Sequence, residues 1–136
     1  MKQKFKREAY GMKLTLVENP AGMIPPQGFS AINLYPFPTY TRMSNSMKRI
    51  SDNTIRHEMI HTMQAKEMLI LPYYLWYFLE WLVKLLVVVI TRRKGDNVAY
   101  KSISFEQEAY YNSENLNYGK ERKWYGWIKY VFKMYN

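Results

Sequence analysis

The sequence contains no cysteine, which excludes disulfide bonds and metal sites built from thiolate ligands. Histidine is almost as scarce, and the chain contains only His57 and His61. A transition-metal site would therefore have to combine these imidazoles with carboxylates. The basic segment 1–10 is followed by no apolar stretch, so we expect no secretory signal and an intracellular location.

Acidic residues are also few, since 11 Asp and Glu stand against 20 Lys and Arg and leave a net charge of +9. This excess predicts an anionic partner, which could be nucleic acid, a membrane surface or an acidic protein. No nucleic-acid-binding pattern accompanies the charge, so nucleic acid is the least favoured of the three. With 136 residues and 48% apolar residues, we expect one domain, 1–136, with a buried core.

The order of local patterns predicts an α+β fold, mostly α, with a short N-terminal sheet. Segment 12–18 alternates apolar and polar residues, as strands do. Segment 29–40 is aromatic and carries Pro36 and Pro38 two residues apart, which suits an edge strand. Three to four helices follow, over 52–69 with Ser51 or Asp52 as N-cap, 71–91, 104–118 with a Ser104–Gln107 capping box, and 121–134.

The strongest chemical signal is the stretch 57–61, which reads His-Glu-Met-Ile-His within the first expected helix. Residues four apart on a helix lie about 40° apart around its axis, so His57 and His61 can converge on one ion. Glu58 lies about 100° from His57, beside such an ion. In zinc hydrolases of this pattern, the glutamate is the general base for a metal-bound water that attacks a carbonyl. The alternative is a chance pair of surface histidines.

A catalytic zinc site needs three protein ligands, so the third ligand has to be a carboxylate. Glu106, Ala109 and Tyr110 share one helix face, and the small Ala109 allows that face to approach another helix closely. Glu108 points about 160° away from Glu106, so only one of the two can bind the ion. We favour Glu106 as the ligand and expect Glu108 to be a solvated charge. The other acids considered are Asp52, Glu67 and Glu80.

The motif, followed about 45 residues later by Glu-x-Glu-Ala, resembles the gluzincins, which are thermolysin-like zinc peptidases. Their pattern Glu-x-x-Ala-Asp matches 106–110, with Tyr110 in place of the aspartate. The chain is also similar to short HExxH proteins of Bacteroidota and their phages. The resemblance implies a Zn²⁺ metallopeptidase with ligands His57, His61 and Glu106, the base Glu58 and a peptide or protein substrate.

The same resemblance implies that segment 29–40 is the edge strand along which a peptide is held. It also calls for an oxyanion donor, and Tyr110, Tyr111 and Arg56 stay open as candidates. Two other functions compete with a peptidase. One is a structural or assembly protein, for example in a phage particle, that keeps the zinc site without turnover. The other is a membrane-associated protein with a chance motif.

Segment 69–90 is 22 residues long with Glu80 and Lys84 as its only charges, which is long enough to cross a bilayer. A single crossing would place 57–61 and Glu106 on opposite sides of the membrane, so a shared zinc site argues against it. We therefore expect a buried core helix in which Glu80 and Lys84 pair. A membrane-surface helix and a true span are the alternatives.

Overall fold

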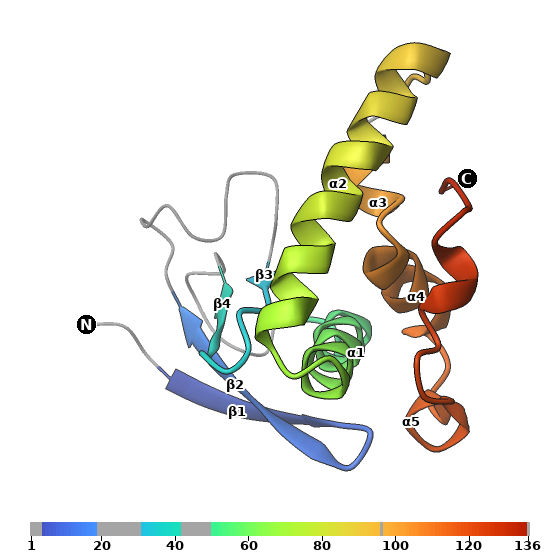
Figure 1. Cartoon of the computed structure of the whole chain (residues 1–136). Coiled ribbons are helices and arrows are strands. Elements are labelled where there is room, and N and C mark those ends of the chain that lie inside the picture. Colours follow the sequence, from blue (N-terminus) through green and yellow to red (C-terminus); the bar gives the residue numbers. More distant parts are fainter. Residues whose placement is uncertain (1–3, 19–30, 42–49, 96, 136) are drawn as a thin grey trace.

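The computed structural model describes residues 4–18, 31–41, 50–95 and 97–135. It confirms a small α+β fold, in which an N-terminal four-stranded mixed sheet is followed by about five helices. Figure 1 shows the sheet on one side of helix α1 and the later helices on the other.

The sheet has the strand order β1-β2-β4-β3. β1 (Lys4–Ala9) and β2 (Met12–Glu18) form an antiparallel hairpin, and β2 confirms the strand predicted over 12–18. β4 (Thr39–Thr41) runs parallel to β2 and pairs antiparallel with β3 (Ala31–Ile32). The sequence did not predict β1, because its solvent face carries lysine and glutamate in place of the usual β-formers.

The single edge strand predicted over 29–40 is replaced by two short strands, while residues 29 and 30 lie outside the described part. β3 is at the sheet edge as predicted, but β4 lies inside the sheet. Pro36 and Pro38 fall in the connection between them, where no ladder amide is needed. The prolines therefore divide the segment.

Helix α1 (Asp52–Glu67) occupies the centre of the molecule. Ser51 is its N-cap, and the Ser51 side chain accepts a hydrogen bond from the Thr54 amide at 3.1 Å. Ile55 and Met59 pack on Leu14 and Leu16 of the sheet. The opposite side of α1 faces α2 and α4, so polar side chains on that side are enclosed.

Helix α2 (Leu71–Thr91) has the predicted bounds but not the predicted burial. Only 11% of its most apolar 18-residue window is buried, so the expected core helix is wrong. The helix is long and apolar enough to span a membrane. Glu80 and Lys84 do pair, at 3.8 Å, and both are buried against the rest of the protein. The two charged residues thus face inward together with Tyr73, and most aliphatic side chains face outward.

Helix α3 (Val98–Lys101) leads into α4 (Ser104–Asn112), which is shorter than the expected helix over 104–118. The predicted capping box does not form, because Ile103 is the N-cap. The amide and hydroxyl of Ser104 instead donate to the Glu80 carboxylate at 2.7 and 2.6 Å. The first residue of α4 is therefore held by the Glu80 side chain of α2.

The helix predicted over 121–134 is wrong. The chain there forms turns and a short 3-10 helix, η2 (Ile128–Tyr130), after the one-turn helix α5 (Tyr118–Glu121). Tyr125 has a positive φ of 57°, and its amide donates to Glu67 of α1. Trp127 inserts into the core and its indole N–H also donates to Glu67, at 3.2 Å. These tertiary contacts outweigh the local helical pattern.

Candidate metal centre

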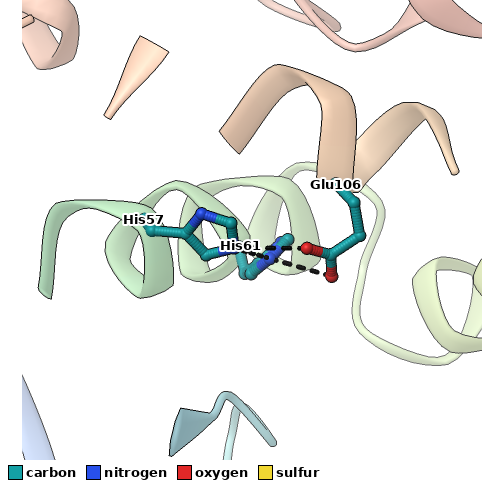
Figure 2. Close-up of side chains that lie close together, drawn as sticks. All are labelled: His57, His61 and Glu106. Atoms are coloured by element: carbon teal, nitrogen blue, oxygen red, sulfur yellow. Dashed lines mark hydrogen bonds and ion pairs between the residues drawn. The ribbon is translucent and has the colours of Figure 1, made fainter. Parts of the chain in front are cut away.

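Two helices bring His57, His61 and Glu106 together. Figure 2 shows the imidazoles projecting from α1 toward the Glu106 carboxylate, which extends from α4. His57 Nε2 lies 3.2 Å from Glu106 Oε1, and His61 Nε2 lies 3.1 Å from Glu106 Oε2. The two Nε2 atoms are 3.2 Å apart. The three residues thus converge as the sequence predicted.

The close approach of α4 to α1 depends on small and shape-matched residues. Ala109 is fully buried one turn after Glu106, as its small size had indicated. Phe105 is buried in a cluster with Ala65 of α1 and Tyr73 of α2. The Gln64 amide on α1 donates to the Phe105 carbonyl at 3.0 Å, which fixes the position of α4 along α1.

The distances fit one metal ion held by three protein atoms. Ligands at about 2.0–2.1 Å from a tetrahedral ion lie about 3.3 Å from one another. The two Nε2 atoms are 3.2 Å apart, each lies 3.1 to 3.2 Å from a different oxygen of Glu106, and one ligand atom from each residue lies within 4.8 Å of the others. Two imidazoles and one carboxylate are a zinc donor set that leaves a fourth position for water or substrate. The three residues therefore have the geometry and the chemistry to hold a metal ion.

The cluster is buried, and its charges are coupled. Burial lowers the pKa of His61, but the adjacent Glu106 carboxylate outweighs this and raises that pKa to about 9. Burial also raises the pKa of Glu106, but His61 and His57 hold it well below its usual range. The cluster therefore stabilises a positive charge between its members, and a metal cation would displace a proton on binding.

A second layer of side chains orients the three residues. The Gln64 carbonyl oxygen accepts from His61 Nδ1 at 2.8 Å, because the Gln64 amide nitrogen is already directed at Phe105 and Glu108. This leaves the lone pair of His61 on Nε2, facing the cluster. On the opposite side, the Tyr77 hydroxyl donates to Glu106 Oε2 at 2.7 Å. Such partners set the direction and basicity of ligands.

We expect Tyr77→Phe to weaken zinc binding by about tenfold, the lower end of the usual effect of losing such a partner. The substitution removes only the hydroxyl that orients Glu106. Competition with a zinc-sensitive dye would measure the change. Tyr74→Phe is the matched control, because the Tyr74 hydroxyl donates to the Tyr35 carbonyl, outside the cluster. Equal affinities in the two variants would contradict an orienting role for Tyr77.

Glu58 lies on α1 beside the three residues and is buried. Its Oε2 atom has no hydrogen-bond partner among the residues that the structure describes. Burial raises the pKa of the Glu58 carboxyl, although the charges of His57 and His61 act in the opposite direction. A buried carboxylate oxygen without a donor is costly, which is typical of a catalytic group.

Glu58, His61 and Glu106 line one wall of a cavity of about 450 Å³. Strand β3 and the two residues after it also line the cavity, and the Asn33 amide donates to the Glu58 carbonyl at 2.7 Å. The rest of the lining is aromatic and belongs mostly to α2: Tyr73, Tyr74, Tyr77, Phe78, Trp81 and Tyr100. The cavity is thus mainly apolar, with the polar cluster at one point of its wall.

The other carboxylates that the sequence offered are engaged elsewhere. Glu108 is fully buried, so the expectation of a solvated charge is wrong, and it pairs with Arg122 at 2.7 Å. Glu67 binds the same guanidinium at 3.2 Å. Glu80 accepts from Ser104, and Asp52 pairs with Arg7 at the other end of α1. Of these acids only Glu106 reaches the histidines.

The three oxyanion donors considered from the sequence lie outside the cavity lined by Glu58, His61 and Glu106. Arg56 donates to the Ser113 carbonyl, and the Tyr111 ring stacks on Tyr130. The Tyr110 ring meets His57 edge-on, with ring centroids 4.6 Å apart. None of these three lines the cavity described above, whereas Tyr77 and Tyr100 do. No sequence pattern indicated either tyrosine, because only the packing of α2 and α3 directs them there.

Comparison of the chain with protein-family models, with curated proteins and with solved structures finds no match.

Proposed function

We propose that this protein is a zinc-dependent metallopeptidase. The observation that carries the proposal is the position of Glu58, a buried carboxylate with one unpartnered oxygen that lines the same cavity as His61 and Glu106. A purely structural zinc site is closed by four protein ligands and needs no base beside it. Here three converging side chains, a further buried carboxylate and a cavity occur together, which supports a catalytic site over a closed structural one.

Under this proposal, three residues would bind the metal, two would orient them and Glu58 would be the general base. Zinc, when bound, polarises a carbonyl and lowers the pKa of water. His57, His61 and Glu106 would hold the ion, with Gln64 and Tyr77 orienting the last two. Glu58 would take a proton from the attacking water and deliver it to the departing amine nitrogen. A pKa raised by burial suits a group that has to accept a proton and then release it.

The cavity and the sheet edge suggest how a peptide would lie. β3 is the last strand in the sheet order, and Ala31 and Ile32 also line the cavity. An extended peptide that pairs with β3 would place its carbonyls beside the metal cluster. Its side chain would enter the apolar cavity, so we expect cleavage next to large apolar or aromatic residues.

The proposal is tested on the wild-type protein, purified without chelators. We expect about one zinc per chain by elemental analysis, and cleavage of members of a diverse peptide library. A chelator should abolish the cleavage, and added zinc should restore it. A protein that contains zinc but cleaves nothing would favour the structural or assembly role. A protein without metal would exclude both functions.

A further inference from the structure

The surface of α2 has an unusual arrangement of side chains. Eleven of its 21 residues are exposed, large apolar side chains. Leu75, Leu79, Leu82 and Leu86 follow the helical repeat and form a continuous stripe, which we call the outer face of α2. Soluble proteins rarely expose an apolar patch of this extent unless it is an interaction site.

The inward side of the same helix carries both of its charged residues beside aromatic ones such as Tyr73. Glu80 accepts from Ser104, and Lys84 Nζ donates to the Lys133 carbonyl, so both charged side chains are satisfied inside the protein. A surface helix of a soluble protein normally turns its charged residues to solvent and its aliphatic residues toward the core. The outer face therefore matches an apolar environment outside the protein.

Basic and aromatic side chains are exposed at the end of α2 and on the C-terminal segment, which packs on the inward side of this helix. Exposed Arg92, Arg93 and Lys94 follow the end of α2 directly. The C-terminal segment runs beside α2, since the Trp76 and Trp127 rings have centroids 5.7 Å apart. That segment exposes Trp124 and Phe132 among the exposed lysines 123, 129 and 133. Tryptophan and lysine together are typical of surfaces that meet the headgroup layer of a membrane.

We propose that the outer face of α2 docks on an anionic lipid bilayer. The apolar stripe would enter the acyl region, and the neighbouring basic residues would contact the charged headgroups. A second copy of the chain is a poorer occupant, because it carries the same net charge of +9 and would be repelled. An anionic surface is attracted by that charge.

The helix would lie along the membrane and not cross it. α3 packs on α2, and Lys84 in its middle bonds to Lys133, so the rest of the protein lies alongside the helix over much of its length. Figure 1 shows only the C-terminal part of α2 projecting beyond the other elements. A crossing would draw this polar body into the hydrocarbon layer, where polar backbone without partners is excluded.

Vesicle co-sedimentation of the full chain tests this docking. We expect binding to vesicles of phosphatidylcholine with phosphatidylserine, weaker binding to pure phosphatidylcholine, and a decrease as salt screens the charges. Leu79→Gln combined with Leu86→Gln should weaken binding at least about tenfold, because two exposed leucines no longer transfer into lipid. Leu116→Gln is the matched control, since Leu116 is an exposed leucine outside α2.

A second variant tests the charge separately. Arg92→Gln combined with Arg93→Gln should weaken binding to the anionic vesicles and leave binding to neutral vesicles unchanged. Wild-type protein that stays in the supernatant, or a leucine variant that binds like wild type, would overturn the proposal. So would a dimer in sedimentation equilibrium that the leucine variant converts to monomer, because a second copy would then cover the face. The test does not depend on peptidase activity.

Discussion

Glu106→Ala is expected to reduce zinc from about one per chain to almost none. Glu106 is the only acid described here that reaches both histidines, at 3.2 and 3.1 Å, and two imidazoles alone do not complete the ligand set of a zinc site. Elemental analysis of the purified variant measures the loss. Glu106→Gln is expected to give the same result, because the amide keeps the shape but removes the negative charge.

The matched control for this experiment is Glu8→Gln, which neutralises an exposed carboxylate on β1 and should retain the metal. Glu108→Ala is not a suitable control. It would be one only if the Glu108 side chain were exposed to solvent, as the sequence had predicted. The Glu108 carboxylate is buried against Arg122, and removing it would leave that cation with fewer partners in the interior. Full zinc content in a folded Glu106→Ala protein would show that another residue is the third ligand.

Glu58→Gln is expected to keep about one zinc per chain and to lose peptide cleavage by about 10²–10⁴-fold. The amide has nearly the same shape as the carboxylate but cannot accept the proton of the attacking water. Because Glu58 is not among the three converging residues, the ion should stay bound. Initial rates on the best peptide of the library, together with the zinc content, separate the two effects.

Glu8→Gln again serves as the control and should cleave at the wild-type rate. A Glu58→Gln protein that contains zinc and cleaves normally would show that the base is elsewhere. Loss of zinc together with activity would instead give Glu58 a role in holding the site. These two outcomes distinguish a catalytic from a structural function of this carboxylate.

The sequence predicted the metal cluster because its members obey local rules. The helical period places His57 and His61 on one side, and it also separates Glu106 from Glu108. The small Ala109 pointed to close helix packing, and it is buried as expected. The helical period shows which residues share a helix face. It does not show which residues pack against the other face, where Glu108 lies. The partner of Glu108 is Arg122, which lies in a segment without regular helix.

The prediction for α2 failed for a different physical reason. A run of apolar residues predicts a helix, and the bounds were correct, but apolarity does not distinguish a protein interior from a lipid environment. Which side faces inward was decided by Glu80 and Lys84, whose partners are Ser104 and the Lys133 carbonyl. Both partners come later in the chain, and the second is a main-chain atom that no side-chain pattern reveals.

His57 and Glu106 are 49 residues apart in the chain and 3.2 Å apart in the structure. An ion bound between them would act as a cross-link that closes a long loop containing all of α2. Such a closure exists only in the folded chain, so the free energy of metal binding adds to the free energy of unfolding. The thermal stability of the protein would then rise with the free zinc concentration of its surroundings, by thermodynamic linkage and without a conformational switch.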